Sequence, residues 1–201
     1  MTLYSIVIPV YKSTKSLETI ASQVNDLQKE KGYNFEIIFV NDSPFFLDTE
    51  TTLSNLVVRY ENVQAFSLKK NQGQQFAVLC GLKKAKGDFI LTMDDDLQHP
   101  VKEIPKLIKA FHADPQVEAI FAVPNFKKRK HDAWRNFGSY LLNKMDVIFL
   151  KKPEGLYKSS FRIMSVELCN TIVNNYNAMP AVSSLIINST NNIKNIEIEH
   201  N

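Results

Sequence analysis

Three consecutive aspartates, Asp94, Asp95 and Asp96, come directly after the apolar run at residues 89–93. Adjacent carboxylates repel one another and lose hydration when buried, so such a cluster is costly unless a cation neutralises it. Carboxylate oxygens suit Mg²⁺ or Mn²⁺, which commonly bind through a few carboxylates and the phosphates of a substrate. The alternative is that these residues form a turn and cap the helix expected after Pro100. Their position at the end of a strand favours a site for a divalent cation and a diphosphate.

A second acidic position, Asp42 in Asn41-Asp42-Ser43, also follows an apolar run. A short carboxylate there could accept hydrogen bonds from a base or a ribose, although an Asx turn explains the same residues without a ligand. Gly73 precedes an expected helix, where glycine permits a tight turn and a close approach of the backbone to a ligand. Turn geometry alone also accounts for that glycine.

Composition excludes several classes of protein. The 201 residues carry a formal net charge of +3, too little for a nucleic-acid-binding surface, and the single basic run, 127–130, is either a solvated loop or a phosphate contact. Cys80 and Cys169 lie far apart without metal-ligand spacing, which is typical of buried small residues in a reducing compartment. The apolar stretch 6–10 has no basic segment before it and ends too early for a signal peptide. A cytoplasmic location, at the inner face of a membrane, is therefore expected.

Alternating apolar runs and helical patterns extend along the chain. The expected strands are 5–10, 35–40, 63–68, 89–93, 117–123 and 161–164, and the expected helices are 17–27, a segment with Leu53, Leu56 and Val57 on one face, 77–85, 101–111, 131–149 and one beginning near Val166. This alternation predicts an α/β protein with a mainly parallel sheet covered on both faces. No linker rich in glycine, proline or serine and no internal repeat divides the chain.

These motifs together resemble the inverting glycosyltransferases of family 2. The resemblance rests on residues 5–11, 39–43, 68–73 and the aspartate cluster with Leu97-Gln98 before Pro100. Within the family, Leu97-Gln98 and the later Phe161-Arg162-Ile163-Met164 are similar to the polyprenyl-phosphate sugar transferases. The resemblance implies a GT-A fold, a Rossmann-like, mainly parallel mixed sheet with helices on both faces.

The resemblance also implies roles for individual residues. Pro9 and Tyr11 would border the nucleotide base, Asp42 would hydrogen-bond it, and Asp94 would reach the ribose or the metal. The implied substrate-binding set is Pro9, Tyr11, Asp42, Lys70, Gly73, Asp94 and Asp95, the implied Mg²⁺ or Mn²⁺ ligands are Asp94, Asp96 and Gln98, and the implied catalytic residues are Asp96 and Arg162. Arg162 and the basic residues 128–135 would face the diphosphate or an anionic acceptor. A salt bridge that supports the sheet is the alternative for Arg162.

Two departures from the family pattern bear on the acceptor. Lys12-Ser13-Thr14 stands where relatives often have Asn-Glu-Glu, so an acidic contact is missing. Ser160 stands where many relatives carry an aspartate proposed as the catalytic base, and serine cannot serve as a base unaided at neutral pH. An acceptor that is already a phosphate anion needs no base, whereas a sugar hydroxyl needs one from elsewhere.

The expected organisation is one glycosyltransferase domain over 1–201. Residues 1–123 would be its nucleotide-sugar-binding half, and 124–201 its acceptor-side half, incomplete where relatives continue beyond Asn201. The expected donor is a UDP-sugar before a GDP-sugar, and the acceptor is a polyprenyl phosphate or a glycan, with peripheral membrane association. Ser160 and the basic residues Lys127 to Lys130 and Arg135 favour the phosphate.

Two other functions compete with this one. A non-catalytic nucleotide-sugar-binding or assembly subunit would explain both Ser160 and the early C-terminus. A sugar-1-phosphate nucleotidyltransferase is disfavoured, because residues 9–14 contain no glycine for a phosphate-binding loop.

Overall fold

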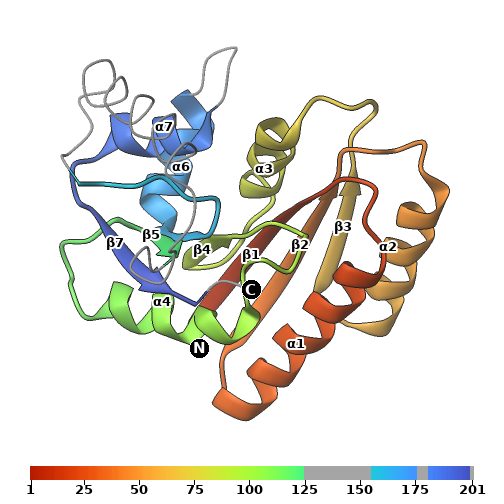
Figure 1. Cartoon of the computed structure of the whole chain (residues 1–201), viewed down its shortest axis with the longest axis horizontal. Coiled ribbons are helices and arrows are strands. Elements are labelled where there is room, and N and C mark those ends of the chain that lie inside the picture. Colours follow the sequence, from red (N-terminus) through yellow and green to blue (C-terminus); the bar gives the residue numbers. More distant parts are fainter. Residues whose placement is uncertain (125–154, 176–180, 200–201) are drawn as a thin grey trace, which may run out of the picture.

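The computed structural model describes residues 1–124, 155–175 and 181–199, and within them seven strands form one sheet (Figure 1). The strands are β1 (Leu3–Val10), β2 (Asn34–Asn41), β3 (Val63–Ser67), β4 (Phe89–Thr92), β5 (Ala119–Pro124), β6 (Arg162–Ser165) and β7 (Ile193–Ile198). The helices are α1 (Lys15–Lys31), α2 (Leu47–Arg59), α3 (Gln74–Leu82), the 3₁₀ turn η1 (Val101–Glu103), α4 (Ile104–His112), α6 (Val166–Asn175) and α7 (Val182–Ser189).

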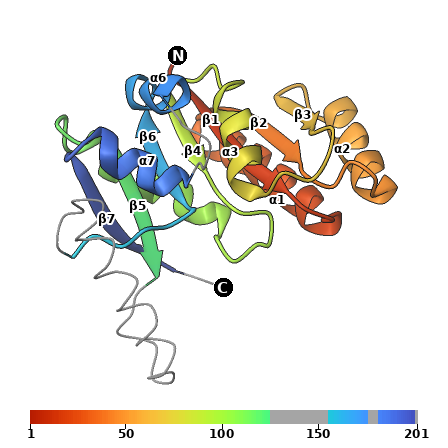
Figure 2. The ribbon, with the colours of Figure 1, turned by 90° about the horizontal axis from the view of Figure 1, so that it is seen from above.

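The strand order is β3-β2-β1-β4-β6-β5-β7, as Figure 2 shows from right to left. Neighbouring strands are parallel except that β6 runs antiparallel to both β4 and β5. The sheet is therefore mixed and mainly parallel, as expected. Because β1 and β2 pair in register from Leu3↔Asn34 to Val10↔Asn41, the loops that follow these two strands begin side by side.

Helices cover both faces of the sheet, which confirms the predicted layering. Buried side chains of α1, α2 and α4 pack in one apolar cluster, and those of α3, α6 and α7 pack in a second cluster on the opposite face. Alternate residues of β1 divide between the two, since Ile6 and Ile8 belong to the first cluster and Val7 to the second. Strands that are buried on both faces read as continuous apolar runs, which is why the sequence pattern located them.

The start of α3 and the division of the helix expected over 101–111 each have a local physical reason. α3 begins at Gln74 rather than at 77, because Gly73, with a φ of 91°, is its N-cap and its carbonyl accepts from the backbone N–H groups of Phe76 and Ala77. The helix expected over 101–111 is divided into η1 and α4. Pro105 lies in the first turn of α4 and has no N–H with which to continue an α-helix from Val101.

Two elements, α7 and β7, have no counterpart among those expected from the sequence. Among the described residues β7 is an edge strand that pairs with β5 alone, so its polar side chains can face solvent and no continuous apolar run marks it. The helix expected at 131–149 and the basic residues 127–130 and Arg135 lie outside the described residues. None of the helices in the described part of the chain combines the length and apolar character that a membrane crossing requires.

Candidate active site at the carboxyl edge of the sheet

A cavity of about 420 Å³ lies where β1, β2 and β4 end. It brings together seven of the residues predicted from the sequence: Pro9, Tyr11, Asp42, Gly73, Asp94, Asp95 and Asp96. Parallel strands place their carboxyl ends at one edge, so loops distant in the sequence meet there. Three lining residues were not predicted, namely Val10, Asn71 and Gln74.

Asp42 is 3% exposed, and both of its carboxylate oxygens accept backbone hydrogen bonds. Oδ1 accepts from the N–H of Gln72 at 2.7 Å and Oδ2 from the N–H of Gly73 at 2.8 Å. Asp42 therefore holds the loop before α3 against the end of β2 and shapes the cavity. Each carboxylate oxygen has a further lone pair, so the predicted hydrogen bond to a base is compatible with this geometry.

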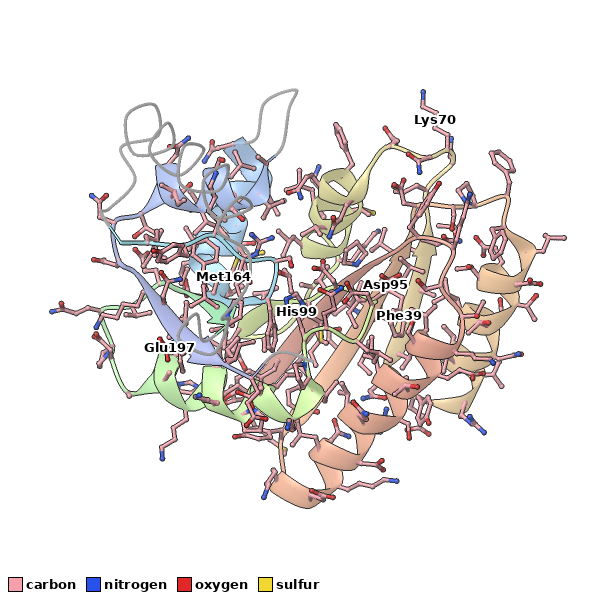
Figure 3. The ribbon with its side chains drawn as sticks, in the orientation of Figure 1. Phe39, Lys70, Asp95, His99, Met164 and Glu197 are labelled. Carbon is pink, nitrogen blue, oxygen red and sulfur yellow. The ribbon has the colours of Figure 1, made fainter. Side chains whose placement is uncertain are left out.

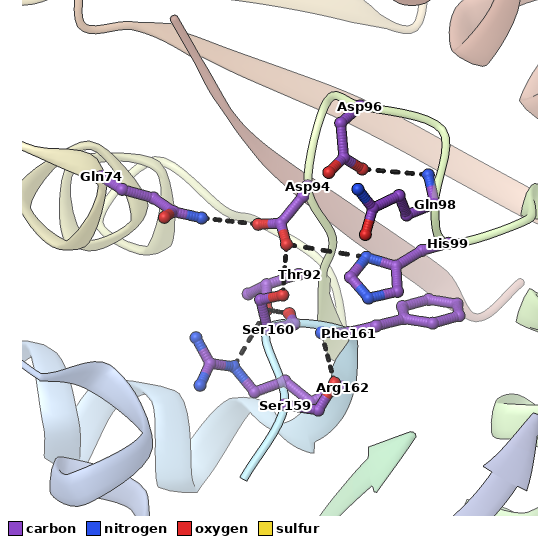
Figure 4. A network of polar contacts seen from close by, with 10 residues as sticks. All are labelled: Gln74, Thr92, Asp94, Asp96, Gln98, His99, Ser159, Ser160, Phe161 and Arg162. Carbon is purple, nitrogen blue, oxygen red and sulfur yellow. Dashed lines mark hydrogen bonds and ion pairs between the residues drawn. The ribbon is translucent and has the colours of Figure 1, made fainter. Parts of the chain in front are cut away.

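Asp94 lies at the centre of a polar network (Figure 4). Its Oδ1 accepts from the side-chain amide of Gln74 at 2.6 Å, and its Oδ2 accepts from the hydroxyl of Ser160 at 2.5 Å. The ring Nδ1 of His99 is 3.8 Å from the same Oδ2. Asp94 thus joins the start of α3 to the segment that precedes β6.

Asp95 connects two loops. Its Oδ2 accepts a hydrogen bond of 3.1 Å from the backbone N–H of Tyr11. Burial raises the pKa of the Asp95 carboxyl, while hydrogen bonds from Ser13 and Tyr11 act in the opposite direction. This aspartate therefore ties the loop after β4 to the loop after β1.

Asp96 is exposed, and its Oδ1 accepts from the backbone N–H of Gln98 at 3.0 Å across Leu97, whose φ is 63°. Gln98 itself does not line the cavity. Within the described ranges, no three or more His, Cys, Asp and Glu side chains converge as a preformed metal site. Asp94 and Asp96 nevertheless fit a hard divalent cation, because Mg²⁺ commonly takes only one or two carboxylates and completes its shell with water and substrate phosphates.

Arg162 is 2% exposed and reaches the same edge because β6 runs antiparallel to β4, where Arg162 pairs with Thr92. Its Nε donates to the Thr92 hydroxyl at 2.9 Å and its Nη1 to the Ser183 hydroxyl at 2.7 Å. Burial lowers the pKa of Arg162 to about 10, and the charge of Asp94 opposes that shift. No carboxylate of the described residues forms an ion pair with Arg162, so the alternative of a sheet-supporting salt bridge is not observed there.

A smaller hollow of about 220 Å³ adjoins the main cavity and shares Gln74 and Asp94 with it. Its other lining residues are Gln75, Lys158, Ser159, Ser160, Arg162 and Ser183. Two cationic side chains and three hydroxyls face this space, a composition that suits an anion. The two spaces therefore meet at Asp94.

The model of the family described as "Glycosyl transferase family 2" matches residues 5–173 of the chain. The chain belongs to glycosyl transferase family 2.

Curated family 2 relatives include the undecaprenyl-phosphate 4-deoxy-4-formamido-L-arabinose transferases of Aeromonas hydrophila and Pseudomonas fluorescens. The first is 31% identical over 163 residues and the second 30% identical over 169 residues, which cover 81% and 84% of this chain. The chain spans about half the length of these relatives, 47% in both cases. The expected resemblance to the polyprenyl-phosphate branch of family 2 is thereby confirmed.

Solved structures confirm the GT-A fold of this family 2 chain. Glucosyl-3-phosphoglycerate synthase from Mycobacterium tuberculosis, solved with Mn²⁺, UDP and phosphoglyceric acid, has a TM-score of 0.71 at 14% identity, covering 98% of this chain and 68% of its own. The S. aureus protein TarS 1–349 has a TM-score of 0.59 at 20% identity and covers 100% of this chain and 59% of its own. At this identity the likeness concerns the fold alone.

Two further positions of the family 2 chain differ from the site expected from its sequence. Lys70 is exposed, lines neither space, and projects from the edge of the molecule (Figure 3). Gln74 was missed, although its place directly after Gly73 was the available signal. Gln74 donates to the Asp94 carboxylate, and Gln75, the next residue of α3, accepts from the backbone N–H of Val182 in α7 at 2.9 Å.

Proposed function

We propose that the chain transfers a sugar, with inversion, from a nucleoside diphosphate sugar to a polyprenyl phosphate. The observation that supports it most is the adjacency of two spaces, an acidic cavity and a hollow with Arg162 and Lys158, which share Asp94. A sugar held between a donor and an acceptor needs two such spaces with a common boundary. The named activity of the longer relatives agrees with this proposal.

The donor would occupy the larger cavity. Its nucleoside would lie against Pro9, Tyr11 and Asp42, and its diphosphate would lie toward Asp94 and Asp96, which line the same space. Asp94 and Asp96 would hold Mg²⁺ or Mn²⁺, which supplies positive charge to the departing nucleoside diphosphate. We propose uridine before guanosine as the base, from the family resemblance.

The acceptor phosphate would occupy the smaller hollow. Arg162 is a buried cation with two neutral hydroxyl partners, and Lys158 adds a second positive charge to the lining. Ser160 cannot act as the base that a sugar hydroxyl would require, but a phosphate monoester is mostly ionised at pH 7. The acceptor that best matches these residues is therefore already a nucleophile.

The reaction balances without a proton transfer. A phosphate oxygen of the acceptor attacks the anomeric carbon, the bond from that carbon to the β-phosphate oxygen breaks, and the nucleoside diphosphate leaves with the electron pair. Gln74 and Ser160 hold the Asp94 carboxylate in one orientation by hydrogen bonds to its two oxygens. Pre-orientation of this kind lowers the cost of reorganisation during the reaction. The sugar transfer would take place at the cytoplasmic face of a membrane.

One alternative remains specific enough to test. A non-catalytic nucleotide-sugar-binding or assembly subunit would retain the larger cavity and need no base, and Ser160 favours it. A glycan acceptor would require a base other than Ser160.

The division into a nucleotide-sugar-binding half at 1–123 and an acceptor half at 124–201 stays a prediction.

The deciding experiment supplies the 201-residue chain with labelled UDP- and GDP-sugars, Mg²⁺ or Mn²⁺, and either vesicles that contain undecaprenyl phosphate or soluble oligosaccharides. We expect label in the lipid fraction. Label in the oligosaccharide alone would refute the phosphate acceptor. Tight donor binding with no label in either fraction would support the assembly subunit.

A further inference from the structure

Three consecutive apolar side chains are exposed where α2 begins. Phe45 is 85% exposed, Phe46 37% and Leu47 76%. They form the apolar tip, which consists of the last two residues of the loop after β2 and the first residue of α2, at the upper right of the molecule in Figure 1. Single exposed apolar residues are ordinary in soluble proteins, but contiguous ones mark interaction sites.

The apolar tip is held in a defined turn. The backbone N–H of Phe46 donates to the carbonyl of Ser43 at 2.9 Å, and the carbonyl of Phe46 accepts from the N–H groups of Thr49 at 3.1 Å and Glu50 at 3.3 Å. The turn is therefore fixed at both ends, and it displays the three side chains outward.

Helix stability does not account for these three residues. Phe46 is the N-cap of α2 and makes no side-chain capping bond, although Ser, Thr, Asp and Asn are preferred there. A hydrophobic staple would pair Phe45 with the fourth helical residue, which is the charged Glu50. The apolar tip thus departs from the local residue preferences of a helix start.

Lysines lie on the two loops that are hydrogen-bonded to the loop before α2. Lys12, Lys69 and Lys70 are exposed, and their loops are joined to the 42–46 loop by hydrogen bonds. The N–H of Lys12 donates to the Ser43 hydroxyl at 2.9 Å, and the Asp42 carboxylate accepts from residues 72 and 73. Across residues 11–14, 42–46 and 68–73, the sole acidic residue is Asp42, which is 3% exposed. These three loops therefore carry three exposed lysines and one buried carboxylate, and the exposed Asp48 follows directly in α2.

We propose that the apolar tip and these lysines dock the protein onto the surface of an anionic lipid bilayer. Aromatic and leucine side chains enter the boundary between headgroups and acyl chains, and lysines bind anionic headgroups, so a bilayer matches both features at once. The cavity described above is lined by Tyr11 and Asn71 of the same loops. Docking would place the mouth of that cavity beside the membrane. The proposal requires neither a donor nor an acceptor and does not rest on the proposed function.

Vesicle flotation without nucleotide or acceptor tests the docking. We expect the chain to float with vesicles of phosphatidylglycerol and phosphatidylethanolamine and to float less with phosphatidylcholine alone. The double substitution Phe45→Ser with Leu47→Ser should lower the partition coefficient by about tenfold or more. Lys12→Gln with Lys69→Gln should lower it on the anionic vesicles only. Raised salt should weaken binding of the unsubstituted chain.

The matched control is Val58→Ser, since Val58 is 89% exposed and lies near the other end of α2. This variant should bind as the unsubstituted chain does. Vesicle binding that survives the Phe45 and Leu47 substitutions would overturn the proposal, and so would a chain that binds no vesicle. Self-association in solution that the double substitution abolishes, with no change in flotation, would assign the apolar tip to a second copy instead. Circular dichroism of each variant excludes unfolding as the cause.

Discussion

The hydroxyl of Ser160 donates a hydrogen bond of 2.5 Å to the carboxylate of Asp94, and the carbonyl of Ser160 accepts one of 2.5 Å from Thr92. The hydroxyl and the carbonyl of the residue that replaces the family's expected base thus hold Asp94 and β4 in place. Ser160 acts through Asp94, as a positioning residue.

Ser160→Ala should therefore reduce transfer only about three- to tenfold, the effect of one lost hydrogen bond of about 1 kcal/mol. The pH profile of kcat should not change, because no base is removed. Steady-state kinetics across pH measure both quantities. A loss of a thousandfold, or a shifted profile, would show that Ser160 takes part in the chemistry itself.

Asp42→Ala should lower the free energy of unfolding by about 1.5 to 3 kcal/mol, because the N–H groups of Gln72 and Gly73 lose a charged acceptor. Nucleotide binding should weaken as the loop loosens, without loss of metal-dependent chemistry. Urea denaturation and calorimetry measure the two effects. Asp26→Ala, at an exposed position of α1, is the control and should change neither.

Nucleoside diphosphate binding should require Mg²⁺ or Mn²⁺, because the aspartates and the two phosphates otherwise repel one another. Calorimetry with and without chelator tests this requirement, and Asp96→Asn should abolish most of the difference. The same substitution should slow transfer on the order of a hundredfold. Equal affinity with and without chelator would count against Asp96 as a metal ligand.

Arg162→Lys should raise the KM for the polyprenyl phosphate by about tenfold, because lysine cannot reproduce the planar fork that now reaches Thr92 and Ser183. The dissociation constant of the donor should stay the same. Arg59→Lys, at an exposed position of α2, is the control. An equal effect on donor and acceptor would place Arg162 at the diphosphate instead.

Asp95→Asn should raise the free energy of unfolding at pH 7 in the presence of chelator. Burial raises the folded-state pKa of Asp95 above its ordinary value, so its protonated form is favoured in the folded state. The stability that this provides is present below the unfolded pKa and is lost as pH rises through the folded pKa. Asparagine keeps an acceptor for the Tyr11 N–H and carries no charge. Denaturation at pH 7 and pH 4 should show a smaller difference at the lower pH.

The sequence by itself determined the layered α/β architecture and the edge of the sheet where ligands would bind. Strands buried on both faces require continuous apolar runs, and those runs are local features that need no partner to be recognised. The polar residues directly after such strands, Asp42 and the aspartate cluster, must then lie at one edge. That reasoning located most of the larger cavity.

Only the tertiary structure decided what each polar side chain does at that edge. Asp94 meets Gln74 and Ser160, which are 20 and 66 residues away, and Arg162 meets Thr92 because an antiparallel strand is inserted beside β4. The place of β7 at the edge of the sheet and the exposure of Lys70 likewise depend on the tertiary structure. A hydrogen-bond partner is set by the relative placement of distant segments, and no local periodicity in the sequence encodes that placement.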